Sequence, residues 1–226
     1  MQQKHSLKKR SLLLSANKYL RGEIIMVDFK FIFDFGSPKT YLVYNLLPGI
    51  EKRTNTKAEY VPVLLGGIFK STNNVSPIES FKTVPAKGKY DDLDTARFVE
   101  KHTIDFNFNS NFPINTLNLM RGAVYAQENG IFDEYVQVVF KSMWVDNKKM
   151  DDLEVIQTVL SENKLPVKEI FEGTQDQKIK DKLVKNTSDA VEKGVFGAPS
   201  LLVDNELFFG KETLQDVEEL ILKKSE

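Results

Sequence analysis

Hydrophobic and polar residues alternate along residues 27–35 of the chain. One side of this segment carries Val27, Phe29, Phe31, Phe33 and Phe35, and the other carries Asp28, Lys30 and Asp34. A period of two residues is typical of a β-strand. Ile32, which falls on the more polar side, indicates that apolar partners cover part of both faces. The pattern therefore predicts a strand with partners on both of its faces.

A helix is expected directly after this strand. Ser37 and Pro38 follow it, and serine is a preferred N-cap while proline is preferred at the first helical position. Apolar residues then recur at helical spacing to about residue 52. Residues 58–65 resemble a second strand, in which Pro62 indicates an edge position or a bulge. This part of the chain therefore has the order strand, helix, strand.

The middle of the chain is expected to be mainly helical. Residues 71–89 are rich in Asn, Ser, Pro and Gly and predict a loop. From Phe132 onward, apolar residues fall at i, i+3, i+4, i+7, i+8 and i+11, which strongly indicates a helix. The helices predicted from such spacing span about 116–127, 132–143, 153–160, 166–172 and 179–191. Gly130 and Gly194 are expected to end two of them.

The last part of the chain returns to β-structure. Residues 200–203 form a short apolar run, Asp204 and Asn205 indicate a turn, and residues 206–209 complete a hairpin. A final helix follows Gly210. The whole order is βαβ, then about 120 mainly helical residues, then ββα, which is typical of the α/β class.

This order predicts two domains. Segments 26–70 and 190–226 can pair into one four-stranded sheet domain, and residues 71–189 would be an all-helical insertion. A groove between two such units is a common place for a small-ligand site.

Composition narrows the class of protein. The chain has 226 residues, 41% of them hydrophobic and 28% charged, which is typical of a globular protein with a sizeable core. No run of 18 apolar residues is present, so no membrane-spanning helix is expected. The absence of cysteine excludes disulfides, thiolate metal sites and a C-x-x-C disulfide oxidoreductase. His102 is the one histidine after the N-terminal segment, so neither a Ser-His-Asp triad nor a metal-ligand set is expected.

Charge is distributed unevenly. Residues 1–22 carry six Lys or Arg and no acid, although the whole chain has a net charge of −1. The acidic remainder argues against nucleic-acid binding. Residues 1–25 are interpreted as a basic extension that is disordered or not translated, for which three origins stay open: a mitochondrial transit segment, a secretory signal, or translation upstream of a working start at Met26. The apolar run at 12–14 is too short for a secretory signal, and Met26 directly precedes the first strand.

Ser37 is the first candidate for chemistry. It lies at the carboxyl end of the first strand, where ligands bind in open α/β sheets, and at a helix start whose N–H groups favour an anion. The alternative is that Ser37 serves only as an N-cap. A second candidate is the bond between Ala198 and Pro199 before an apolar strand, for which cis and trans both stay open.

Four segments together resemble one family. Residues 33–42, F-D-F-G-S-P-K-T-Y-L, are similar to the D-F-x-S-P-x-x-Y-L signature of the 2-hydroxychromene-2-carboxylate isomerases. Three other segments match that family in order, namely 64–74, 111–123 and 194–212. These enzymes are relatives of kappa-class glutathione transferases and of DsbA-like proteins. The resemblance covers about 27–222 and implies a thioredoxin-like domain interrupted by a helical one.

The resemblance implies glutathione as cofactor and Ser37 as the catalytic serine. It also implies a set of glutathione-contacting residues, namely Ser37, Pro38, Asn74, Lys87, Ala198, Pro199, Lys211 and Glu212. Pro199 matches a cis-proline, and Ala198 would pair with the cysteine moiety through its backbone. Lys211 and Glu212 stand where the family has a Ser-Asp pair that holds the γ-glutamyl end.

The implied activity is isomerisation, in which a thiolate stabilised by Ser37 adds reversibly to a conjugated aromatic pyruvate-type substrate. A kappa-like glutathione transferase or peroxidase is the second hypothesis, and a non-catalytic thioredoxin-fold binding module is the third. The expected partners are glutathione, a small aromatic or electrophilic substrate and a second copy of the chain in a homodimer, with no nucleic acid or membrane. The expected location is the cytoplasm, or the mitochondrion if residues 1–25 are a targeting segment.

Overall fold

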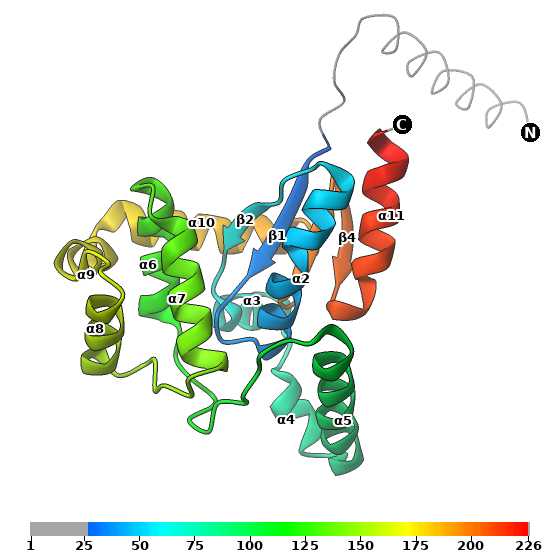
Figure 1. Ribbon diagram of the computed structural model, residues 1–226, viewed down its shortest axis with the longest axis horizontal. Helices are drawn as coiled ribbons and strands as arrows, with labels where there is room; N and C mark the ends of the chain where they lie inside the picture. Colours follow the sequence, from blue (N-terminus) through cyan, green and yellow to red (C-terminus); the bar gives the residue numbers. More distant parts are fainter. Residues whose placement is uncertain (1–26, 226) are drawn as a thin grey trace, which may run out of the picture.

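The fold is built on a mixed four-stranded sheet. The structure is a computed structural model and describes residues 27–225, so the predictions for residues 1–25 lie outside the described residues. The strands are β1 (Phe29–Phe33), β2 (Glu59–Pro62), β3 (Ser200–Val203) and β4 (Glu206–Phe209), in the spatial order β2-β1-β3-β4 (Figure 1). Strand β2 runs parallel to β1, whereas β3 is antiparallel to both β1 and β4. The predicted pairing of early and late strands into one sheet is confirmed.

The helices of the described residues surround this sheet. They are α2 (Pro38–Thr54), α3 (Leu65–Thr72), α4 (Pro77–Phe81), α5 (Pro85–His102), α6 (Leu117–Glu128), α7 (Phe132–Trp144), α8 (Leu153–Glu162), α9 (Val167–Gln175), α10 (Gln177–Glu192) and α11 (Leu214–Ser225), with the 3-10 turn η1 (Lys211–Thr213) before the last. Gly130 and Gly194 have positive φ angles of 71° and 87°, which favour glycine and fit the predicted helix ends. None of the helices in residues 27–225 combines the length and apolar character that a membrane crossing requires.

The two faces of β1 are covered by different helices, as its mixed pattern predicted. Phe31 and Phe33 lie in the main core, and the Phe33 ring lies 6.1 Å from the ring of Phe140 in α7. Ile32 points to the opposite face, where it joins a smaller cluster with residues of α3 and α10, among them Ile68 and Ala190. Helices α6–α9 lie to one side of the sheet in Figure 1, and α11 lies at the opposite side beside β4. The sheet and the α6–α9 helices share one continuous core. The division into domains at residues 70 and 190 stays a prediction.

The prediction of a loop over residues 71–89 was wrong. Helix α4 lies within that segment, α5 begins inside it, and α3 begins before it. Ser76 caps α4 with Pro77 at the first helical position, so α4 begins with the same Ser-Pro pair as α2. Helices α4 and α5 bury no residue, so they carry no continuous apolar stripe from which a helix could be predicted.

Candidate active site

Ser37 lies in the turn between β1 and α2. Its hydroxyl accepts a hydrogen bond from the backbone N–H of Thr40 at 3.2 Å, which makes it the N-cap of α2. The same hydroxyl donates to the carbonyl oxygen of Ala198 at 2.9 Å. Only 6% of the residue is exposed. Ser37 is therefore an N-cap, as the simpler interpretation held, and it is also joined to the second candidate segment.

The segment around Ala198 is held against the Ser37 turn by its own contacts. The Ala198–Pro199 peptide bond is cis, as is Phe112–Pro113, which no sequence pattern indicated. The Pro199 carbonyl accepts from the N–H of Gly210 at 3.0 Å. The side-chain amide of Asn74 donates to the carbonyl of Phe196 at 3.0 Å, which brings the end of α3 to the same segment. The side chains of Ser37 and Asn74 therefore both donate hydrogen bonds to backbone carbonyls within residues 196–198.

The start of α2 is electropositive. The first turn contains no acidic residue, and Lys39 stands two positions after Ser37. A helix N-terminus carries about half a positive charge from its aligned peptide dipoles. The hydroxyl of Thr40 is fully buried and has no hydrogen-bond partner among the described residues. The Ser37 hydroxyl at this helix start, with no acidic residue in the first turn itself, suits an anion such as a thiolate.

Lys211 is buried between α5 and the last helix. Only 3% of it is exposed, and its ammonium pairs with Asp94 at 2.6 Å and Glu212 at 2.7 Å. The Phe98 ring lies 4.7 Å from the same nitrogen. Burial alone would lower the pKa of Lys211, but the hydrogen bonds and charges of both carboxylates raise it above its ordinary value. The hydrogen bond from Lys211 lowers the pKa of Asp94.

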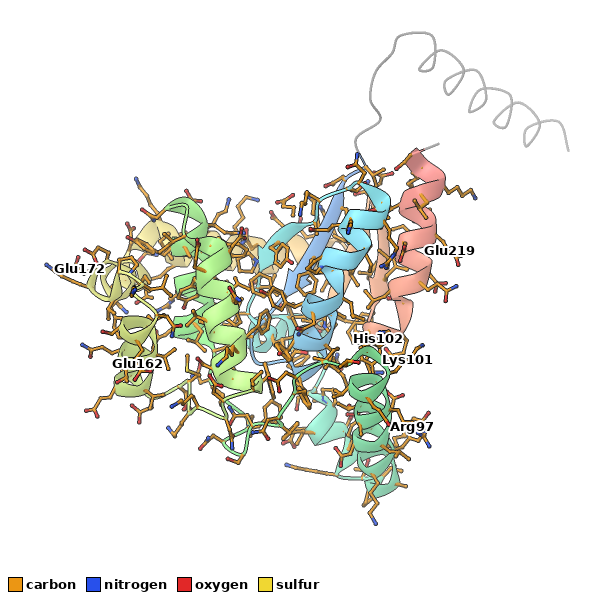
Figure 2. The ribbon with its side chains drawn as sticks, viewed as in Figure 1. Arg97, Lys101, His102, Glu162, Glu172 and Glu219 are labelled. Carbon is orange, nitrogen blue, oxygen red and sulfur yellow. The ribbon has the colours of Figure 1, made fainter. Side chains whose placement is uncertain are left out.

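These contacts dock α5 against the sheet unit. Figure 2 labels Arg97, Lys101 and His102 along the last turns of α5, whose Asp94 pairs with Lys211 directly before α11. Burial, followed by the charges of Lys101 and Lys211, lowers the pKa of His102. On the same helix, Asp91 pairs with Lys39 at 2.9 Å.

Lys87 lies one helical turn before Asp91 on α5. It borders an open groove of about 360 Å³ together with Phe81, Ala86, Tyr90 and Asp91. The ion pair between Asp91 and Lys39 ties this groove to the first turn after Ser37. Lys87 thus lines a groove that is connected to the first turn of α2 through Asp91 and Lys39, and no direct contact between Lys87 and Ser37 is seen among the described residues.

Sequence reasoning assigned no role to Asp34, which it placed on the polar side of a strand and quoted as the first residue of the signature around Ser37. The residue is fully buried, and its carboxylate accepts from Gly36 N–H at 2.9 Å, Leu65 N–H at 2.8 Å and the Thr116 hydroxyl at 2.7 Å. Burial raises the pKa of Asp34, and the three hydrogen bonds partly offset this effect. The available signals were its place in that signature and its position as a lone carboxylate at the strand end, three residues before Ser37.

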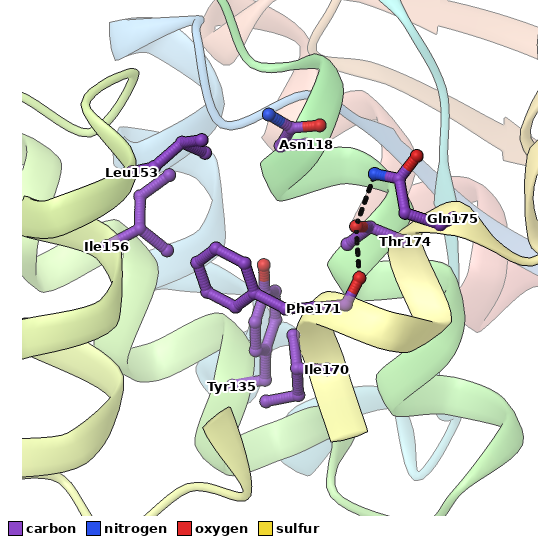
Figure 3. Close-up of a pocket in the computed structure, with 8 residues that line it drawn as sticks. All are labelled: Asn118, Tyr135, Leu153, Ile156, Ile170, Phe171, Thr174 and Gln175. Carbon is purple, nitrogen blue, oxygen red and sulfur yellow. Dashed lines mark hydrogen bonds between the residues drawn. The ribbon is translucent and has the colours of Figure 1, made fainter. Parts of the chain in front are cut away.

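A second, smaller cavity lies among α6, α7, α8 and α9. Its volume is about 90 Å³, and Figure 3 shows the ring of Phe171 and the side chains of Leu153 and Ile156 around it, with the amides of Asn118 and Gln175 on one side. None of the predicted site residues lines it. The candidate active site is therefore the region around Ser37 and Ala198.

The sheet, the helical insertion and the serine at the strand-to-helix turn define a class of protein. Residues 29–222 match the family described as the DSBA-like thioredoxin domain, and the chain belongs to that family. Within it, the chain is similar to proteins named 2-hydroxychromene-2-carboxylate isomerase. It is 26% identical to the one from Sphingobium xenophagum over 85% of this chain and 96% of the relative. It is 28% identical to the one from Pseudomonas sp. (strain C18) over 90% of this chain and 93% of the relative.

Solved structures show the same fold. A structure of 2-hydroxychromene-2-carboxylate isomerase superposes with a TM-score of 0.75 at 22% identity, covering 86% of this chain and 94% of that one. A probable DsbA oxidoreductase from Streptomyces coelicolor superposes with a TM-score of 0.68 at 13% identity, covering 88% of this chain and 89% of that one.

Proposed function

We propose that the chain is a glutathione-dependent isomerase of the 2-hydroxychromene-2-carboxylate isomerase type. The observation that carries the proposal is the position of the Ser37 hydroxyl, which caps α2 and contacts the Ala198 carbonyl. The relatives that bear this name match nearly their whole length and so support the same activity here. When bound, glutathione would supply a thiolate that adds reversibly to a conjugated carbon of the substrate and is released unchanged.

The task of the protein is to hold that sulfur as a thiolate near neutral pH. A free thiol has a pKa of about 8.5, and lowering it by two pH units needs about 2.7 kcal/mol. A hydrogen bond from Ser37 to the charged sulfur contributes about 1.5–3 kcal/mol. The N-terminus of α2 adds about 0.3–2 kcal/mol. The Ser37 hydroxyl and the N-terminus of α2 together are therefore sufficient to lower the thiol pKa by two pH units.

Ser37 can make this contact by exchanging one acceptor for another. Its hydrogen now points to the Ala198 carbonyl. In the proposed complex the hydrogen turns to the sulfur, and the Ala198 carbonyl becomes free to accept from a peptide N–H of glutathione. The buried side of the site then loses no hydrogen bond, which keeps the exchange favourable.

The remaining contacts are assigned to residues at the edges of the site. Pro38, Asn74, Lys87 and Pro199 would contact the peptide, as their family counterparts do. Glu212 is 64% exposed at its side chain and binds Lys211 through one carboxylate oxygen, which leaves the other oxygen for the ammonium of the γ-glutamyl end. Lys211 is only 3% exposed and its ammonium is paired with Asp94 and Glu212, so we assign it the role of orienting Glu212 rather than of contacting glutathione.

The direct test is turnover with full accounting of glutathione. The purified chain is incubated with glutathione and 2-hydroxychromene-2-carboxylate, and both the isomer formed and the glutathione remaining are quantified. The proposal predicts isomer with complete recovery of glutathione, loss of turnover in Ser37→Ala, and wild-type turnover in Ser161→Ala, a control at an exposed serine of α8. Accumulation of a stable glutathione conjugate would favour a transferase instead. Equal turnover in Ser37→Ala and wild type would overturn the assignment of Ser37.

A further inference from the structure

The turn that presents Ser37 is held mainly by contacts from far along the chain. The N–H of Phe35 lies 3.4 Å from the sulfur of Met120 in α6, and its carbonyl accepts from the indole N–H of Trp144 at 2.8 Å. The N–H of Ser37 donates to the Asp34 carbonyl at 3.2 Å. The backbone groups just before Ser37 are thus fixed by α6, α7 and Asp34, and the turn has little freedom to move alone.

The Asp34 carboxylate joins three segments at this point. One oxygen accepts from the N–H of Gly36 and the hydroxyl of Thr116, and the other accepts from the N–H of Leu65. These donors belong to the Ser37 turn, the start of α6 and the start of α3. We call these three hydrogen bonds the Asp34 link.

The packing at the link leaves almost no slack. A Cβ atom added at Gly36 would lie 3.1 Å from the methyl carbon of Thr116 and 3.3 Å from an Asp34 oxygen. Gly36 is therefore closely packed against both residues, and its N–H is tied to the Asp34 carboxylate by the 2.9 Å hydrogen bond. All three groups that face the Asp34 carboxylate, from its own turn, α3 and α6, are neutral donors.

We propose that Asp34 is the positioning residue of Ser37 and that Thr116 holds it in place, so that the helical insertion sets how strongly the site stabilises a thiolate. This inference rests on the proposed function. Asp34 does not touch the reacting atoms in this scheme. It acts by fixing the Gly36–Ser37 backbone, and thereby the direction of the Ser37 hydroxyl and the first-turn N–H groups.

The direction in which the pKa of the glutathione thiol changes distinguishes a positioning role of Asp34 from an effect of its charge alone. Removing the negative charge of Asp34 would, by charge alone, make a nearby thiolate more favourable and lower the thiol pKa. Loss of position has the opposite effect, because a misaligned hydroxyl stabilises the thiolate less. Asp34→Asn cannot restore the link, since its NH₂ group meets the N–H of Leu65 or the other donors. Positioning therefore predicts a raised thiol pKa.

The experiment compares Asp34→Asn, Thr116→Val and Thr116→Ser with a matched control, Thr174→Val. Thr174 and Thr116 are both 6% exposed, but the Thr174 hydroxyl donates to Phe171 in α9 instead. The pKa of bound glutathione is measured by ultraviolet absorbance of the thiolate. The affinity for S-methylglutathione, which has no thiol to ionise, reports peptide binding separately. Hydrogen exchange at the N–H groups of Gly36 and Leu65 is measured without glutathione.

We expect Asp34→Asn and Thr116→Val to raise the thiol pKa by about half a pH unit or more, a threefold loss of thiolate preference. Affinity for S-methylglutathione should stay within about twofold, where twofold is well under one kcal/mol. Exchange at Gly36 and Leu65 should become faster. Thr116→Ser and Thr174→Val should match the wild type in thiol pKa and in hydrogen exchange at Gly36 and Leu65. If Asp34→Asn does not fold, Thr116→Val alone decides the result.

Three results would overturn the inference. A lowered thiol pKa in Asp34→Asn would mean that the charge of Asp34 matters and its position does not. A lowered thiol pKa in Thr116→Val, which keeps Asp34, would mean that the link does not help the site to stabilise the thiolate. An unchanged thiol pKa together with faster hydrogen exchange at Gly36 and Leu65 would mean that the Asp34 link stabilises the fold locally and does not affect the thiolate. If the wild type itself does not ionise glutathione, the proposed function fails instead, and the exchange data still report whether Thr116 holds Asp34.

Discussion

Substitution of Lys211 and substitution of Asp94, which form an ion pair, should lower the free energy of unfolding by unequal amounts. Lys211 is 3% exposed, whereas the side chains of Asp94 and Glu212 are 33% and 64% exposed. Lys211→Met removes the buried charge, keeps a side chain of similar length against Phe98, and leaves two carboxylates that water can reach. The cost of removing one partner comes from the charge that stays buried, and here both remaining carboxylates are partly exposed, so we expect a change within about 1 kcal/mol.

Asp94→Asn should cost more, although it alters the more exposed residue. It leaves a buried ammonium with Glu212 as its one remaining carboxylate partner among the described residues. Removing one partner of a fully buried pair costs about 3–5 kcal/mol, and the exposure of Asp94 and the retained Glu212 reduce the expected loss to about 1–3 kcal/mol. Urea unfolding at pH 7 measures both variants. A greater loss in Lys211→Met than in Asp94→Asn would refute this reasoning.

The same pair predicts a dependence on pH with a defined sign. The pKa of Asp94 is lowered in the folded chain, so its contribution to stability is present above the ordinary aspartate pKa. That contribution is lost as the pH falls through the lowered value. The pKa of Lys211 is raised, so its contribution is lost only as the pH rises through the raised value. The stability difference between wild type and Asp94→Asn should therefore shrink in acid, and a constant difference down to the acid limit would contradict the assignment.

Two further substitutions test the contacts that hold the turn before Ser37. Trp144→Phe leaves the buried Phe35 carbonyl without its 2.8 Å donor, and we expect a loss of about 2–4 kcal/mol in urea unfolding from the unpaired acceptor and the smaller ring. A loss below about 0.5 kcal/mol would show that the indole N–H is dispensable. Gly36→Ala must displace Thr116 or Asp34 by a few tenths of an ångström, so we expect about 1–3 kcal/mol of destabilisation. A neutral Gly36→Ala would contradict the tight packing.

Local patterns predicted the parts of the fold whose neighbours are close in sequence. The hairpin of β3 and β4 was predicted with the observed bounds, because an apolar run and a turn pair specify it within ten residues. Helix α7 was predicted because one face of it is buried along its length. Helix α5 was missed because none of its residues is fully buried and only Phe98 and Val99 pack partly against the core, which leaves no continuous apolar stripe beside its ion pairs.

The site was predictable only in part, for the same reason. The signature around Ser37 and the resemblance at Ala198 located the two segments that the structure joins by a hydrogen bond. Asp34 was misjudged because its partners Leu65 and Thr116 lie 31 and 82 residues away. Lys211 likewise finds Asp94 at a separation of 117 residues. A pattern of alternating residues records which face a side chain occupies and gives no information on which distant segment covers that face.

The acidity of bound glutathione tests the central role of Ser37 most directly. Glutathione is titrated into wild type and Ser37→Ala, and the ultraviolet absorbance of its thiolate is followed against pH. The account predicts that the wild type ionises the thiol near neutral pH. It also predicts that Ser37→Ala raises that pKa by about one to two pH units, as loss of a hydrogen bond to a charged group requires. Equal ionisation in both proteins would contradict it, because Ser37 would then be an N-cap alone.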